Sequence, residues 1–141
     1  MILKVVFDTN IFISAFILPG GRAEAVFLAA IEADFELLTS TAILTETAGK
    51  LAEKFDWEEE MVIRAIKLIS SASAEVLRTD PSIHSLSDEA DNRILECAVE
   101  EKTSILVTGD KHLLALRRYG DIRIMRLTDF LAMLAERKSP S

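Results

Sequence analysis

Cysteine and histidine are scarce in this sequence, which has one cysteine, Cys97, and two histidines, His84 and His112. A single cysteine excludes an intramolecular disulfide framework, and these three residues cannot supply the four ligands of the usual structural zinc site. Any metal ion bound by the protein would therefore have oxygen ligands. We expect Cys97 to be a small core residue, because it lies in an apolar helical stripe, and both histidines to lie on the surface.

Long apolar runs are also missing. No segment approaches the ~18 apolar residues of a membrane span, and the start of the chain, with Lys4 and Asp8, lacks the apolar core of a secretory signal. We therefore expect a cytoplasmic protein with no membrane partner. The net charge of -7 argues against a surface that attracts nucleic acid as a whole, because phosphate binding needs positive potential. A localised basic patch remains compatible with this charge.

Three signatures of phosphate chemistry are absent as well. No GxxxxGK[ST] motif occurs, which disfavours a P-loop nucleotide hydrolase. Phosphatases of the haloacid-dehalogenase type need a second aspartate two residues after the first, where this chain has Asn10 after Asp8. A response-receiver domain needs adjacent acids early in the chain, and the phrase FDTN has only one.

Short apolar segments rich in β-branched residues alternate with helical patterns along the chain. We predict strands at 3–7, 36–40, 75–78, 104–108 and 122–125, and helices at 11–18, 22–33, 41–55, 57–71 and 88–100. The alternation predicts an α/β fold, with three α/β/α layers and a central, mostly parallel sheet. With 141 residues, 50% of them hydrophobic, one domain over 1–135 and a polar tail at 136–141 are expected. Asp56 and Glu59 resemble a capping box for the helix at 57–71.

Three aspartates follow this pattern in comparable places. Asp8 and Asp110 come directly after apolar strand candidates, and ligands of open parallel sheets bind beyond the carboxyl ends of the strands. Asp91 lies in the first turn of a helix, in register with its apolar stripe, so it should face inward. Each could instead be a turn residue or a helix cap, with Asp88 as the cap beside Asp91. Together, with Lys111 as the one base in the same phrases, they favour a bound cation.

Glu46 is less distinctive by pattern alone. It lies about 200° around its helix from Leu44, at ~100° per residue, and so falls outside the main apolar stripe. This position is typical of an exposed glutamate.

Four phrases carry a resemblance to a known family: VVFDTNIFISAF, LLTSTAILTETAGKL, DEADNRILECAV and ILVTGDKHLLAL. In this order, and over nearly the whole chain, they resemble the PIN-domain nucleases. They look most like the bacterial and archaeal branch of toxin components of toxin–antitoxin systems, the VapC-like PIN family.

The resemblance implies a site and a reaction. It makes Asp8, Glu46, Asp91 and Asp110 the acids that bind Mg²⁺ or Mn²⁺, and gives Asn10 an orienting role beside the first acid. It implies a metal-dependent endoribonuclease that hydrolyses RNA to 5′ phosphate and 3′ hydroxyl products, with a small antitoxin protein as partner. Two features depart from the branch: the SDEAD phrase lacks a proline often seen there, and His112 stands where a further aspartate is common.

RNA would also need cations along its backbone. The densest basic stretch begins next to Asp110 and comprises Lys111, Arg117, Arg118, Arg123 and Arg126. The alternative is a solvated helix face with strand ends. Exposed apolar helix surface would suit a homodimer or an antitoxin groove. Two rival functions stay open: a PIN fold that binds RNA or protein without turnover, and a housekeeping RNA-processing nuclease.

Overall fold

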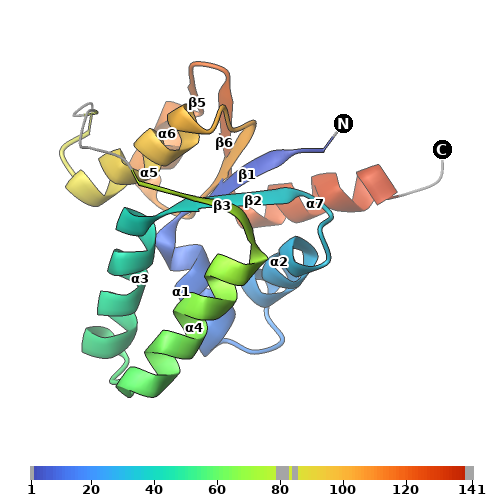
Figure 1. Cartoon of the computed structure of the whole chain (residues 1–141). Helices are drawn as coiled ribbons and strands as arrows, with labels where there is room; N and C mark the ends of the chain where they lie inside the picture. The colour runs from blue at the N-terminus through green and yellow to red at the C-terminus, as the bar shows by residue number, and fades with distance from the viewer. Residues whose placement is uncertain (1, 79–82, 84–85, 139–141) are drawn as a thin grey trace.

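The computed structural model describes residues 2–78, 83 and 86–138 of the chain. Within these residues a six-stranded sheet has the order β3-β2-β1-β4-β6-β5, and its neighbouring strands are parallel except for β5 and β6 (Figure 1). The strands are β1 (Lys4–Phe7), β2 (Glu36–Ser40), β3 (Ser73–Leu77), β4 (Ile105–Val107), β5 (Arg118–Tyr119) and β6 (Ile122–Met125). The mostly parallel α/β fold predicted from the sequence is confirmed.

Helices cover both faces of this sheet. They are α1 (Thr9–Ile17), α2 (Arg22–Ile31), α3 (Thr41–Lys54), α4 (Glu59–Ala72), α5 (Glu89–Glu100), α6 (Lys111–Leu116) and α7 (Leu127–Lys138). Figure 1 shows α1, α2 and α4 on one side of the sheet and α5 and α6 on the other. Because each parallel strand is followed by a helix, the helices after β1, β2 and β4 all begin at the carboxyl edge of the sheet.

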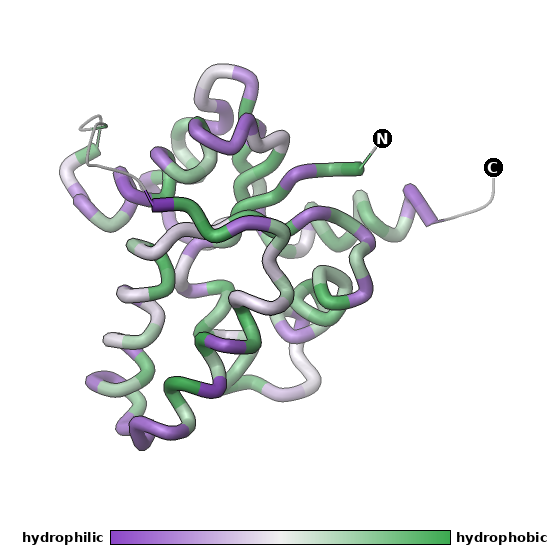
Figure 2. The backbone as a smooth tube through the Cα atoms, in the orientation of Figure 1, coloured by the Kyte–Doolittle hydropathy of each residue, from purple (hydrophilic) through white to green (hydrophobic). Residues whose placement is uncertain are grey.

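The core forms where α1, α2 and α7 pack on one face of the central strands. Phe7 of β1 contacts Phe12 and Phe35, with ring centroids 5.5 and 5.8 Å apart, and Phe35 contacts Phe130 of α7 at 5.2 Å. Burying each such ring stabilises the fold by roughly 2–3 kcal/mol relative to leaving it exposed. Figure 2 shows β1 as largely hydrophobic, as expected of a strand covered on both faces.

The capping box predicted at Asp56 is wrong. α4 begins at Glu59, after a Glu58 cap that makes no side-chain hydrogen bond. Asp56 instead takes a left-handed backbone conformation with φ of 52°, which aspartate tolerates better than most residues. The N–H of Trp57 then donates to the carbonyl of Leu51 at 3.0 Å and closes the end of α3. Asp56 therefore ends one helix and does not start the next.

The C-terminal part of the chain is more ordered than its polar composition suggests. α7 extends through Lys138, so residues 136–138 of the expected polar tail are helical, and residues 139–141 lie outside the described part. Among the described helices, none alone is long and apolar enough to cross a membrane. α1 and α2 reach that length and composition only as a pair, which is bent by 104° at the break between them.

Candidate active site

Three aspartates cap helices that begin beside one another. Asp8 joins β1 to α1, Asp110 precedes α6 after β4, and Asp88 precedes α5. In each case Oδ1 accepts a hydrogen bond from the backbone N–H two residues further along the chain, at distances of 2.8–3.2 Å. Asp8 and Asp110 follow neighbouring parallel strands, so they reach the same edge of the sheet. The prediction that Asp88 caps α5 is confirmed.

Asp8 is almost completely buried at this edge, with 4% of its surface exposed. Its Oδ2 accepts a hydrogen bond of 2.6 Å from the Thr108 hydroxyl, and its Oδ1 accepts the 3.2 Å bond from the Asn10 N–H. Burial raises the pKa of Asp8, and the Asp110 charge raises it further, whereas the two hydrogen bonds and Lys50 lower it. A cation placed here would remove the cost of keeping this carboxylate ionised.

Asp91 is the most perturbed acid of the group. Burial, followed by the charges of Asp110, Asp88 and Asp8, raises its pKa to about 7, and His112 opposes this rise. The carboxyl group of Asp91 therefore shares one electrostatic environment with those of Asp8, Asp88 and Asp110. The Oδ2 atom of Asp91 is buried and has no hydrogen-bond partner among the described residues. Such an atom is rare in native structures, and an ion or a water could satisfy it.

Asp110 is linked to Asp8 through Thr108. The Asp110 N–H donates to the Thr108 Oγ1 at 3.0 Å, and the same hydroxyl donates to Asp8. Thr108 itself is fully buried, so this hydroxyl has a fixed orientation. A recess of about 390 Å³ opens beside the pair and is lined by Asn10, Gly109, Asp110, Lys111 and His112. The recess gives solvent and ligands a polar approach to the acids.

Glu46 and Asn10 are joined by a residue that the sequence analysis missed. The Lys50 Nζ lies 3.1 Å from the Glu46 Oε1 and donates to the Asn10 Oδ1 at 3.3 Å. Glu46 is 26% exposed, so it lies at the margin of the buried acids. The four-residue spacing of a glutamate and a lysine on a helix could have signalled this pair.

Two further buried polar residues on α5 hydrogen-bond to Ile83 and Leu86, which precede the helix. The Asn92 side chain donates to the Leu86 carbonyl at 2.8 Å and accepts from the Leu86 N–H at 3.0 Å. Glu96 accepts from the Ile83 N–H at 2.8 Å, and Arg93 donates to the Ile83 carbonyl at 2.9 Å. No periodicity reveals these contacts, because they join a helix to Ile83 and Leu86, which belong to no helix or strand. His84 lies outside the described residues.

The oxygen donors at this edge suit a hard divalent cation. Asp8, Asp91 and Asp110 contribute carboxylates, and the unpartnered Oδ2 of Asp91 is buried among like charges. Across the described residues, no three Asp, Glu, His or Cys side chains already form a closed set that could hold a metal ion. Mg²⁺ usually keeps several waters and takes only one or two carboxylates, so it does not need such a set. The acids therefore fit an ion held partly through water.

The predicted basic stretch is exposed throughout. Arg118 and Arg123 face each other across the β5–β6 pair, and Arg126 follows β6 at the carboxyl edge of the sheet. Like charges in directly opposed positions destabilise a strand pair. These arginines form no ion pair with a described residue, so their charge is available to an anion.

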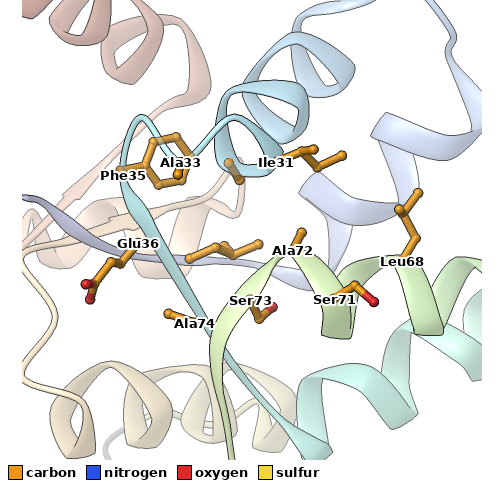
Figure 3. Close-up of a pocket in the computed structure, with 11 residues that line it drawn as sticks. Ile31, Ala33, Phe35, Glu36, Leu68, Ser71, Ala72, Ser73 and Ala74 are labelled. Atoms are coloured by element: carbon orange, nitrogen blue, oxygen red, sulfur yellow. The ribbon is translucent and has the colours of Figure 1, made fainter.

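A second recess, of about 350 Å³, lies at the end of the sheet where β2 and β3 begin, and Figure 3 shows the side chains that line it. It is lined by the first residues of β2 and β3 and by the ends of α2 and α4, including Ile31, Phe35, Leu68 and Ala72. The candidate acids follow the opposite ends of the parallel strands. This mainly apolar recess therefore contributes nothing to the chemistry of the acids.

Residues 4–112 match the family model described as a PIN domain. An uncharacterized protein of Methanocaldococcus jannaschii is 34% identical over 119 residues, which cover 82% of this chain and 76% of that protein.

Two solved structures share the fold. The first is VapBC2 from Rickettsia felis bound to a DNA fragment from their promoter, with a TM-score of 0.61, 14% identity and coverage of 88% of this chain and 98% of the matched chain. The second is FitAB bound to an IR36 DNA fragment, with a TM-score of 0.56, 19% identity and coverage of 87% and 94%. At these identities the likeness supports the fold alone.

Proposed function

Because the chain belongs to the PIN-domain family, whose members are generally nucleases, we propose that it is a metal-dependent endoribonuclease. The observation that carries the proposal is the meeting of Asp8, Asp91 and Asp110 at one edge of the sheet. Two of these acids have raised pKa values, and one has a buried oxygen without a partner. Perturbed acids beside an open recess are typical of an active site.

Asp8, Asp91 and Asp110 would hold Mg²⁺ or Mn²⁺, and Glu46 of α3 would add a carboxylate at the margin of the site. When bound, such an ion activates a water and neutralises charge on the phosphate oxygens in phosphodiester hydrolysis. The protein positions the acids for this. The Thr108 hydroxyl holds Asp8 at 2.6 Å, and helix capping fixes Asp110 through its Oδ1. The backbone N–H of Asn10 donates to the Oδ1 of Asp8 and so helps to orient this carboxylate.

The substrate we propose is RNA, cut to leave a 5′ phosphate and a 3′ hydroxyl. The recess beside Asp110 is lined mainly by polar and charged residues, and one of them, Lys111, can meet a backbone phosphate. The exposed Arg117 and Arg118 directly follow α6, the short helix that begins at Lys111. Because the chain carries a net charge of -7, this local positive region would be needed to attract RNA.

We also propose that the protein is the toxin of a toxin–antitoxin pair and forms a homodimer. The solved structures that share its fold, VapBC2 and FitAB, are both described as bound to DNA fragments. The chain exposes large apolar side chains on α2 and α4, among them Leu28, Met61 and Leu68, which a protein partner could cover. Co-expression with the product of an adjacent short reading frame tests the pairing, because a true antitoxin would copurify and inhibit cleavage.

Cleavage of total RNA by the purified protein tests the reaction, the cofactor and the site together. Cleavage is expected with Mg²⁺ or Mn²⁺ and is expected to stop with EDTA. Asp91→Asn and Asp8→Asn, purified in parallel, should lose it by at least about a hundredfold, since a metal ligand supplies much of the transition-state stabilisation. Cleavage that survives in Asp8→Asn, in a preparation free of host nucleases, would reject the site. Metal and RNA binding without any cleavage would favour a binding module.

A further inference from the structure

Lys50 occupies an unusual position between two of the candidate site residues. Its Nζ contacts the Glu46 Oε1 at 3.1 Å within α3 and also reaches the Asn10 Oδ1 at 3.3 Å in the first turn of α1. Asn10 is two residues beyond Asp8, and the positive charge of Lys50 opposes the rise in the pKa of that acid. The side chain is only 26% exposed, so the ammonium is held at the site.

These contacts distinguish Lys50 from an ordinary surface ion pair. A glutamate and a lysine four residues apart on one helix stabilise it by only ~0.2–0.5 kcal/mol and need no further partner. Here the ammonium joins two helices and places a positive charge beside the acids. Lys54, one turn further along α3, makes no ion pair with a described residue and is exposed. The same helix therefore offers a matched lysine without these contacts.

Building on the proposed nuclease function, we infer that Lys50 is a resident cation of the active site. It neutralises Glu46, so that the chain binds one divalent ion, at Asp8, Asp91 and Asp110, and Lys50 supplies the second positive charge toward the substrate. The ammonium and a second divalent ion would compete for the same carboxylate.

The donor count of Lys50 supports this role toward phosphate. A lysine ammonium has three N–H donors, and two are directed at Glu46 and Asn10. The third has no partner among the described residues and can donate to a phosphate oxygen of the RNA. Lys50 would therefore help to position the scissile phosphate beside the bound ion. An arginine at position 50 could preserve the positive charge, whereas a methionine would preserve only the approximate length of the side chain.

Calorimetric titration with Mn²⁺ tests the inference without relying on activity. The wild-type protein should bind one ion per chain. Lys50→Met should bind the first ion about tenfold more tightly, because a like charge has been removed, and should take up a second ion at the vacated Glu46. Lys50→Arg and Lys54→Met should both bind as the wild type does. Circular dichroism should show the same helical content in all variants.

RNA binding in EDTA provides an independent measurement. Lys50→Met should bind a single-stranded oligonucleotide several-fold more weakly than Lys54→Met, with a salt slope lower by about 0.7. Two ions in the wild type, or an unchanged Mn²⁺ isotherm in Lys50→Met, would overturn the role of Lys50 and leave the nuclease proposal standing. Absence of any Mn²⁺ binding at millimolar concentration in the wild type would instead reject the proposed function and the role of Lys50 with it.

Discussion

Replacing Asp91 with asparagine is expected to stabilise the metal-free protein at pH 8, although it should abolish cleavage. The folded protein holds Asp91 with a pKa of about 7, whereas the ordinary value is 3.8, chiefly because the residue is buried. Between these two values the folded state binds a proton that the unfolded state has lost. The stability of the wild-type fold therefore falls as the pH rises through this window, and the whole loss is present above it.

The size of the effect follows from the two pKa values. Each tenfold change in a proton equilibrium corresponds to about 1.36 kcal/mol, so ionised Asp91 destabilises the fold by about 4 kcal/mol at pH 8. At pH 5 the same relation gives only about 2 kcal/mol, because little more than one pH unit separates this pH from the unfolded pKa. Relative to Asp91→Asn, the wild type should lose about 2–3 kcal/mol between pH 5 and pH 8. For a chain of this length that is roughly 7–10 °C in melting temperature.

Urea unfolding in EDTA at several pH values from 5 to 8 measures this difference. The free energies of unfolding of the wild type and Asp91→Asn should diverge as the pH rises. Asp121→Asn removes an exposed acid in the β5–β6 turn and should follow the wild type at every pH. Parallel wild-type and Asp91→Asn curves would show that the fold does not hold Asp91 with a raised pKa. Added Mn²⁺ should stabilise the wild type at pH 8 and leave Asp91→Asn almost unchanged.

Three further predictions concern the support of the site and its substrate. Thr108→Val removes the 2.6 Å bond to Asp8 and should lower stability by about 1–3 kcal/mol and weaken Mn²⁺ binding at pH 7, whereas Thr108→Ser should retain both. Asn92→Ala leaves the Leu86 N–H and carbonyl without their side-chain partner and should lower the free energy of unfolding by about 1–3 kcal/mol. Reversing the charge of Arg117 and Arg118 to glutamate should weaken RNA binding and reduce its salt slope; unchanged filter binding would remove both residues from the interface.

The sequence predicted the fold well where one periodic signal dominated. β1 and β4 are apolar, β-branched and buried on both faces, so their patterns allow few alternatives. The capping box predicted from Asp56 and Glu59 was wrong because the same spacing of acids suits the end of one helix and the start of the next. Only the left-handed backbone at Asp56 distinguishes the two, and it depends on how α3 packs. α7 was not predicted, although its Phe130 completes the aromatic core.

The surroundings of the site were harder to predict than its acids. Periodicity places Glu46 outside the apolar stripe of its helix, and the structure indeed leaves it partly exposed. The contact of Lys50 with Asn10 joins residues 40 positions apart, so nothing local in the sequence indicates it. Asn92 and Glu96 are buried polar residues that hydrogen-bond to backbone groups of Leu86 and Ile83, and any residue offers such groups. Side-chain identity alone therefore could not reveal these contacts.

The alternatives posed for the aspartates, helix cap or metal ligand, do not exclude each other. A cap bond uses one lone pair of Oδ1, and an ionised carboxylate has about four lone-pair sites. The backbone N–H groups of His112 and Leu113 donate to the Oδ1 of Asp110, so capping orients the carboxylate while its second oxygen can meet a ligand. Asp91 differs, because it is buried, caps nothing and has an Oδ2 without a described partner. Capping accounts for Asp88 and Asp110 even without a ligand, whereas the buried Oδ2 of Asp91 has no described partner, and a cation would offset the cost of burying it. Without a metal ion, ionised Asp91 would therefore destabilise the fold, which the comparison with Asp91→Asn measures.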